Sequence, residues 1–137
     1  MREMQTEQIT QVIREMCIEA NYRLAPDMKC VFNQAVDQEE SPLGRQVLKQ
    51  LEENLRIADE DMIPICQDTG MAVVFLKAGQ EVHFTGGSLT NAVNEGVRRG
   101  YEEGYLRKSV VGDPIERVNT RDNTPAVIHY EIVEGDQ

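Results

Sequence analysis

The chain has 137 residues, of which 40% are hydrophobic and 28% charged, a balance typical of one globular domain and not of a disordered tail. Its formal net charge of −10 argues against nucleic-acid binding, because contacts to phosphates require a basic face. No stretch approaches the ~20 consecutive apolar residues of a membrane span, and the charged first segment has no apolar signal core. We therefore expect no membrane partner and a cytoplasmic location.

The three cysteines, Cys17, Cys30 and Cys66, form no C-x-x-C pair, which argues against a zinc ribbon or a thioredoxin motif. An odd number of cysteines in a cytoplasmic protein also argues against a disulfide framework. Three interpretations stay open for these thiols: inert buried side chains, a catalytic nucleophile, or ligation of a metal centre that is completed elsewhere.

The first part of the chain predicts helices. Apolar residues from Ile9 to Ala20 recur at the three-and-four spacing of one helical face, and Cys17 lies on this stripe as an expected buried thiol. Pro26 suits the first turn of a second helix. Ser41-Pro42 reads as a cap followed by a first-turn proline, and it begins a third helix that extends to Ala58.

The helical periodicity ends near Asp59. Residues 59–70 combine a proline, an aspartate and a terminal glycine without any repeat, which predicts a loop with turn chemistry. Residues 71–76 and 81–84 read as two short strands, and their close spacing suggests a hairpin.

Gly86-Gly87-Ser88 then leads into another amphipathic helix, which we expect to end near Gly100 or Gly104, and residues 126–133 form the last clear strand. We therefore predict an α+β fold, in which an N-terminal helical layer packs with a small, mostly antiparallel sheet. The predicted organisation is a single domain of residues 1–137, with a helical part (1–58), a loop (59–70) and an α+β part (71–137).

The most informative segment is the run from Pro64 to Gly70, which we call the Cys66 loop: Pro64-Ile65-Cys66-Gln67-Asp68-Thr69-Gly70. A thiol, an amide, a carboxylate and a hydroxyl stand next to one another between a predicted helix and a predicted strand. Reactive groups are often placed on such loops, because rigid elements on both sides hold them. The alternative is a turn whose polar side chains only satisfy its own backbone.

The Cys66 loop resembles the N-terminal cluster-ligand motif of the class I fumarases and tartrate dehydratases. The resemblance covers essentially the whole chain in order, through Gly86-Gly87, Tyr105-Leu106-Arg107-Lys108-Ser109, Val118-Asn119-Thr120 and Asn123-Thr124-Pro125-Ala126. The C-Q-D-T-G run by itself is moderately specific, whereas the ordered set is strong. The resemblance implies that the chain is the N-terminal part of the catalytic α region of such an enzyme.

In that family a four-iron four-sulfur cluster is held by three cysteines, and its fourth iron is left open to bind substrate. Dehydration of a 2-hydroxy dicarboxylic acid must expel hydroxide, a poor leaving group, and an open iron acts on that hydroxyl as a Lewis acid. The resemblance implies that Cys66 is the first cluster ligand. It also implies that two further cysteine ligands lie outside this chain.

By the same resemblance, Gln67 binds a substrate carboxylate, and Asp68 binds substrate and takes part in proton transfer as a catalytic residue. The alternative for Asp68 is an Asx-turn that merely closes the loop. Arg107 matches an arginine that clamps a substrate carboxylate with its planar fork, and its alternative is a solvated surface charge. Thr69 is expected to bond to backbone, and Gly70 to have a positive φ angle.

Two further points concern residues outside this set. A zinc site of Cys66, His83 and His129 is conceivable, although histidines in predicted strands more often pack or form hydrogen bonds. The late loop reads Asn119-Thr120-Arg121, whereas members of the family often have glycine as the third residue. We therefore expect the glycine-specific backbone conformation to be absent there.

The predicted function is part of an iron–sulfur hydro-lyase that reversibly dehydrates a 2-hydroxy dicarboxylic acid (malate to fumarate, or tartrate to oxaloacetate), with this chain inactive on its own. The implied partners are a small dicarboxylate substrate, a β subunit or C-terminal domain, and further copies in an oligomer. One alternative is a non-catalytic assembly or regulatory module that retains the fold. A more distant one is a thiol-dependent catalyst with Cys66 as the nucleophile.

Overall fold

The computed structural model describes residues 1–137 and contains four helices and four short strands, which confirms the α+β class. Their order along the chain is β1 (Arg2–Gln5), α1 (Thr6–Tyr22), α2 (Pro26–Gln38), α3 (Pro42–Asp61), β2 (Val73–Gly79), β3 (Val82–Thr85), α4 (Leu89–Glu103) and β4 (Val127–Val133). None of the helices is both long and apolar enough to span a membrane.

The predicted helix starts are confirmed. Ser41 Oγ accepts a hydrogen bond from the Gly44 N–H (3.3 Å), and Ser88 Oγ accepts one from the Asn91 N–H (3.4 Å). These side chains satisfy backbone donors that have no partner within their own helix. Helix α4 ends where it was expected to end, with Gly104 as its C-cap.

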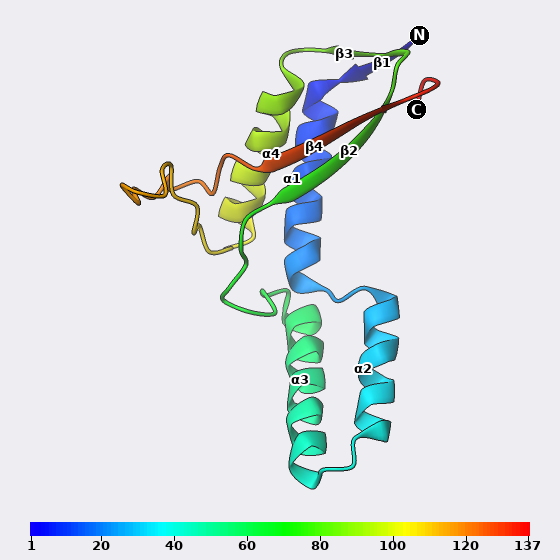
Figure 1. Cartoon of the computed structure of the whole chain (residues 1–137), viewed down its shortest axis with the longest axis vertical. Helices are drawn as coiled ribbons and strands as arrows, with labels where there is room; N and C mark the ends of the chain where they lie inside the picture. Colours follow the sequence, from blue (N-terminus) through cyan, green and yellow to red (C-terminus); the bar gives the residue numbers. More distant parts are fainter.

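The hydrophobic core lies between α1 and α4, which run side by side in Figure 1. Its buried members are Ile13, Tyr22, Val93, Val97, Tyr101 and Leu106. The two helices approach closely because α4 has glycines where it faces α1. A Cβ atom at Gly96 would lie 2.7 Å from the Thr10 carbonyl oxygen, and one at Gly100 would lie 2.9 Å from the Arg14 carbonyl oxygen.

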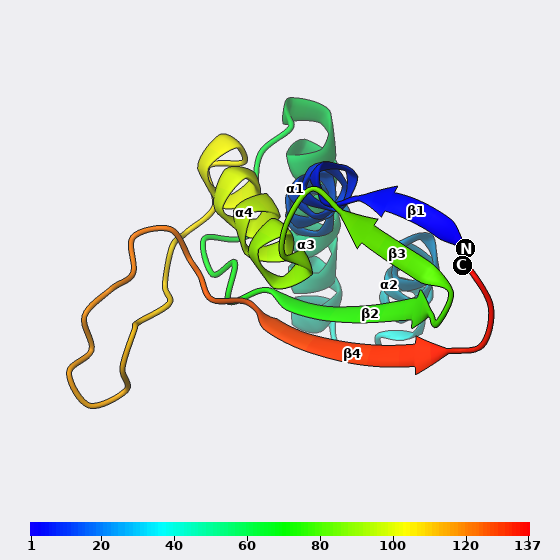
Figure 2. The same cartoon turned by 90° about the horizontal axis from the view of Figure 1, so that it is seen from above.

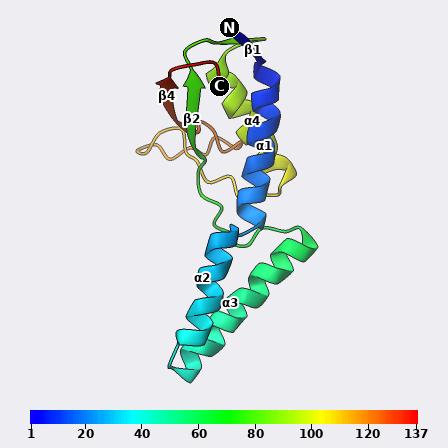
Figure 3. The same cartoon turned by 90° about the vertical axis from the view of Figure 1, so that its right-hand side faces the viewer.

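Helices α2 and α3 form a hairpin that projects from this body, as Figures 1 and 3 show. No residue of α2 is buried, and Ala58 is the only buried residue of α3. Large apolar side chains on both helices face solvent, among them Val31 (54% exposed) and Leu43 (70% exposed). The helical part is therefore not one layer, because α1 packs on α4 whereas α2 and α3 pack mainly on each other.

The expectation of a mostly antiparallel sheet is wrong. The strands form two separate two-stranded sheets, β1 with β3 and β2 with β4, and both pairs are parallel. Figure 2 shows the two arrows of each pair pointing the same way. Parallel pairing requires a crossover connection. For the pair of β2 and β4, this connection contains β3 and α4.

The predicted hairpin of β2 and β3 is also wrong, although only Gln80 and Glu81 separate these strands. The N–H of Gln80 donates to the Val133 carbonyl (2.8 Å), and the N–H of Glu81 donates to the Gly135 carbonyl (3.0 Å). Because the end of β4 and the residues after it accept these hydrogen bonds, the chain does not fold back on β2. It turns instead into the second sheet, where β3 pairs with β1.

The backbone of the late loop corrects another expectation. Arg121 has a φ of 69°, so the left-handed conformation is present although the residue is not glycine. The Arg121 N–H donates to Asn119 Oδ1 at 2.6 Å, which supports this turn. Asn123, two residues further on, is also left-handed, with a φ of 61°.

Candidate functional site

The Cys66 loop lies where the projecting hairpin meets the main body, between the end of α3 and the start of β2 (Figure 1). Two hydrogen bonds fix the beginning of the loop. The Ile65 N–H donates to the Asn21 carbonyl at the end of α1 (2.8 Å), and Asn54 Nδ2 on α3 donates to the Ile65 carbonyl (3.0 Å). The residue before Cys66 is thus held by two helices.

The end of the loop is fastened to the segment that carries Arg107. Thr69 Oγ1 accepts from the Arg107 N–H (2.9 Å) and lies 3.2 Å from the Arg107 carbonyl oxygen, to which it donates. The Tyr101 hydroxyl lies 3.1 Å from the Thr69 carbonyl and 3.3 Å from the Gly70 carbonyl. The expectations that Thr69 bonds to backbone and that Gly70 has a positive φ (61°) are confirmed. Residues 38 positions apart along the chain are therefore brought together.

Cys66, Gln67 and Asp68 are all exposed. The Cys66 Sγ accepts a hydrogen bond from the Asp68 N–H at 3.4 Å. The Asp68 carboxylate accepts no hydrogen bond from the loop backbone, so the Asx-turn that would explain this residue structurally is not formed. The Gln67 amide is likewise left without a hydrogen-bond partner, and both side chains are therefore available to a ligand.

Arg107 is exposed, and only its backbone atoms form hydrogen bonds. Its guanidinium makes no ion pair, whereas the nearby Arg98 and Arg99 both pair with Glu95 on α4. An unpaired guanidinium keeps its donors free for an incoming carboxylate. This arrangement fits a ligand-binding arginine, and it is equally compatible with a solvated surface charge.

The late loop supplies two residues whose contacts sequence reasoning did not identify. Asp122 accepts hydrogen bonds from the Thr124 N–H (3.0 Å) and hydroxyl (2.8 Å), and it pairs with Arg98 at 3.0 Å. Although burial alone would raise it, these partners lower the pKa of Asp122 to about 2. The neighbouring Asn123 is fully buried and donates to the Gly70 carbonyl (3.0 Å).

The remaining cysteines and histidines do not join the site. Cys17 packs against the core, and burial raises the pKa of its thiol to about 11, while Cys30 is exposed on α2. His129 stacks on Phe75 with ring centroids 4.8 Å apart. No three His, Cys, Asp or Glu side chains of the chain come together as a metal site, so the zinc site of Cys66, His83 and His129 is not formed.

Cys66 fits a cluster ligand in two respects. Its sulfur is exposed on a loop, and a backbone N–H donates to it, which is a common way of supporting a ligating thiolate. It would be the single cysteine ligand from this chain, because Cys17 is packed in the core and Cys30 lies on the projecting hairpin. Gln67 and Asp68 would then stand beside the bound group.

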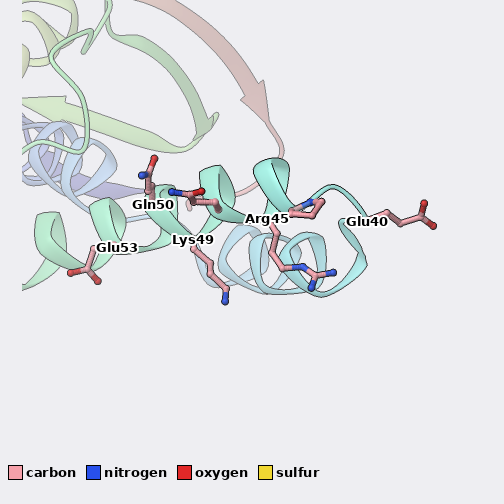
Figure 4. A pocket seen from close by; sticks show the side chains of 7 residues that line it. Glu40, Arg45, Lys49, Gln50 and Glu53 are labelled. Atoms are coloured by element: carbon pink, nitrogen blue, oxygen red, sulfur yellow. The ribbon is translucent and has the colours of Figure 1, made fainter.

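Two surface depressions help to delimit the site. The larger, of about 650 Å³, lies along α3, and its side chains point away from one another, as Figure 4 shows for Arg45 and Gln50. It does not include the Cys66 loop. A second groove, of about 470 Å³, is mostly apolar and is lined by α1 and the start of β2. It includes Thr69 and Tyr101, and it therefore borders the loop directly.

Comparison with known proteins gives consistent matches. The sequence profile of the family described as fumarate hydratase (fumerase) matches residues 10–137. A protein of Methanocaldococcus jannaschii named "Putative L(+)-tartrate dehydratase subunit alpha" is 36% identical over 130 residues, covering 94% of this chain and 45% of the relative. "Fumarate hydratase class I, anaerobic" of Escherichia coli is 35% identical over 134 residues, covering 96% of this chain and 24% of the relative.

"L(+)-tartrate dehydratase subunit alpha" of Escherichia coli is more distant, at 26% identity over 116 residues, or 85% of this chain and 38% of the relative. The chain thus spans less than half the length of each of these curated relatives. Because the family profile covers nearly all of the chain, and the matched region includes the whole Cys66 loop and Arg107, the chain belongs to the class I fumarate hydratase family.

Proposed function

We propose that this chain is the N-terminal part of the catalytic α region of an iron–sulfur hydro-lyase. Its reaction is the reversible dehydration of a 2-hydroxy dicarboxylic acid, either malate to fumarate or tartrate to oxaloacetate. The observation that carries the proposal is the junction at Thr69, which holds the exposed Cys66 loop against the Arg107 segment. Relatives named as fumarate hydratase and as tartrate dehydratase support both substrates.

Cys66 would be one of three thiolates that hold a four-iron four-sulfur cluster, with the other two supplied from outside this chain. When bound, such a cluster supplies an iron with an open position, which weakens the carbon–oxygen bond of a substrate hydroxyl by Lewis-acid chemistry. The protein's part is to place the rest of the substrate around this position. Three exposed side chains of the chain are suited to that task.

Arg107 would bind one substrate carboxylate through two parallel N–H···O hydrogen bonds, since its guanidinium has no competing partner in the chain. The Gln67 amide would donate to a carboxylate oxygen from the opposite side. The Asp68 carboxylate would accept or return a proton during the reaction, and its free oxygens support this role. Residues from two segments of the chain would thus bind one small dianionic substrate.

The proposed partners follow from the same reasoning. A β subunit or a C-terminal domain would complete the site, and this chain alone would be inactive. The exposed apolar side chains of α2 and α3 support an oligomer or a further domain. A cytoplasmic location is proposed because the three cysteines are free thiols, which a reducing compartment preserves.

The test is hydration of fumarate by the complete native assembly, purified and reconstituted without oxygen. We expect activity that is lost in air and restored by iron and sulfide. Cys66→Ser should lose bound iron and activity together, whereas the matched Cys30→Ser variant should keep both. Full iron content and activity in Cys66→Ser would refute the ligand assignment.

The same experiment addresses the non-catalytic alternative, in which the chain is an assembly or regulatory module. The specific observation behind this alternative is the set of exposed apolar side chains on α2 and α3, which suits an assembly surface. A demonstrably complete assembly that binds no iron, does not hydrate fumarate and does not dehydrate tartrate would favour it.

A further inference from the structure

Asn123 is an unusual residue of the core because it is polar and completely buried. It is 0% exposed, as are Val93 and Val97, whereas most of its loop faces solvent. A buried amide that lacks hydrogen bonds destabilises the fold, because it loses its contacts with water and gains none in return. Its partners therefore explain why an asparagine is tolerated at this position.

The Asn123 side chain joins two other segments of the chain. Its Nδ2 donates to the Gly70 carbonyl at the end of the Cys66 loop (3.0 Å). Its Oδ1 accepts from the N–H groups of Ser109 (2.7 Å) and Val110 (3.0 Å), just after Arg107. One amide thus satisfies backbone groups that lie 53, 14 and 13 positions away along the chain.

The chemistry of asparagine suits this position closely. An amide offers a donor and an acceptor at its two ends, so it can bridge a carbonyl on one side and two N–H groups on the other. The backbone of Asn123 is left-handed, with a φ of 61°, a conformation that asparagine adopts more readily than most residues. Serine is too short for this bridge, and aspartate lacks the donor.

We propose that Asn123 is a positioning residue that fixes the spacing between the Cys66 loop and the Arg107 segment. The proposal rests on the proposed function, in which these two segments hold opposite sides of one substrate. Thr69 links the same segments at the surface, through both backbone groups of Arg107. Asn123 provides the buried link, and it acts through the two segments without touching the substrate itself.

The most informative variant is Asn123→Asp, because it removes the hydrogen bond to Gly70 and keeps those from Ser109 and Val110. A carboxylate still accepts from Ser109 and Val110, but it cannot donate to the Gly70 carbonyl, which it would repel. The Arg107 segment should stay in place while the Cys66 loop comes loose. In the complete enzyme we expect kcat to fall by about tenfold or more and KM to change less than about threefold, since misplaced groups slow the reaction while the carboxylate clamp persists.

Amide hydrogen exchange provides a readout that does not depend on activity or on bound iron. In Asn123→Asp the Arg107 amide should exchange faster, because its acceptor is Thr69, next to Gly70. The Ser109 and Val110 amides should keep their protection. Overlapping peptides from the complete assembly can resolve these positions.

Asn94→Asp is the matched control. The Asn94 side chain also accepts from a backbone N–H (Ala126, 2.8 Å) and donates to a carbonyl (Thr90, 3.0 Å), but it forms no hydrogen bond with the Cys66 loop or the Arg107 segment. The Asn94→Asp variant should leave amide exchange at Arg107, kcat and KM unchanged. A purely structural role for Asn123 would instead make the two variants behave alike, and that result would overturn the proposal.

Two further outcomes are decisive. If the complete wild-type assembly neither hydrates fumarate nor dehydrates tartrate, the proposed function fails, while the exchange pattern still decides whether Asn123 holds the two segments. If Asn123→Asp does not fold, amide exchange in the wild-type protein tests whether Asn123 holds the Arg107 segment. Ser109 and Val110 amides that exchange as fast as the exposed loop would show that Asn123 does not hold them, and slow exchange would support the proposal.

Discussion

Gly96 sets how closely α4 approaches α1, and its replacement by alanine puts two opposing effects in direct competition. In an exposed helix, alanine stabilises relative to glycine by about 1 kcal/mol. At position 96, however, the added Cβ would lie 2.7 Å from both the Ile13 Cβ and the Thr10 carbonyl oxygen. Neither atom can swing aside, because one is a branch point next to the main chain and the other belongs to the backbone of α1.

Overpacking a well-filled core costs about 1–3 kcal/mol. Taking about 2 kcal/mol for the clash and subtracting about 1 kcal/mol for helix propensity leaves a net loss of about 1 kcal/mol. The matched control is Gly44→Ala on α3. The Cβ there would meet the carboxyl end of Glu39, a flexible side chain that can move away. We expect Gly44→Ala to be neutral or slightly stabilising.

The assay is equilibrium urea unfolding with two probes. Tyrosine fluorescence reports on the core through Tyr22 and Tyr101, because the chain has no tryptophan, and circular dichroism reports on all four helices. Gly96→Ala should lower the midpoint of the fluorescence transition. A Gly96→Ala protein as stable as wild type, or more stable, would refute the close packing of α1 on α4.

Three further predictions concern single side chains. Cys17 should react with iodoacetamide at pH 8 at least about tenfold more slowly than the exposed Cys30, because burial raises the pKa of its thiol to about 11 and depletes the thiolate; equal rates in labelling followed by mass spectrometry would contradict this. The pKa of Asp122 is depressed from 3.8 to about 2, so the stability it contributes is present above about pH 4 and is lost as the pH falls towards 2; Asp122→Asn should flatten the unfolding free energy in this window, and an unchanged slope would count against it. In the complete enzyme, Arg107→Lys should raise KM by about tenfold, since an ammonium cannot donate the two parallel hydrogen bonds of a guanidinium. Unchanged kinetics would mean that Arg107 is a solvated surface charge that does not bind substrate.

The helices could be predicted from the sequence because their signals are local. Ser41 caps the helix that it was expected to cap, and the apolar spacing between Ile9 and Ala20 identified α1. Strand pairing could not be predicted in the same way, since it depends on residues far apart along the chain. The strand Arg2–Gln5 has no apolar alternation at all, and it exists because β3 pairs with it.

The site shows the same division. The Cys66 loop and Arg107 stood out as motifs, and Thr69 joins them directly. The further contacts that hold the loop come from Tyr101 and Asn123, which lie 32 and 53 positions from their partners in the loop. Asn123 lies in a run that matches the family, but nothing local distinguishes a buried bridging amide from an ordinary turn asparagine. Only the tertiary structure assigns it a contact.

The Tyr101 hydroxyl is a further link to the Cys66 loop, and its removal tests whether this link acts locally. Tyr101→Phe keeps the ring in the core and deletes the hydrogen bond to Thr69 and Gly70, at a cost of about 1 kcal/mol. Tyr22→Phe is a matched control, because the Tyr22 hydroxyl also donates to a buried carbonyl, that of Gly104 at 2.9 Å. Both variants should lose similar stability in urea unfolding. Only Tyr101→Phe should speed amide exchange at Arg107, since that amide depends on Thr69. Equal exchange in the two variants would mean that the loop is held by its other contacts, and that Tyr101 serves the core alone.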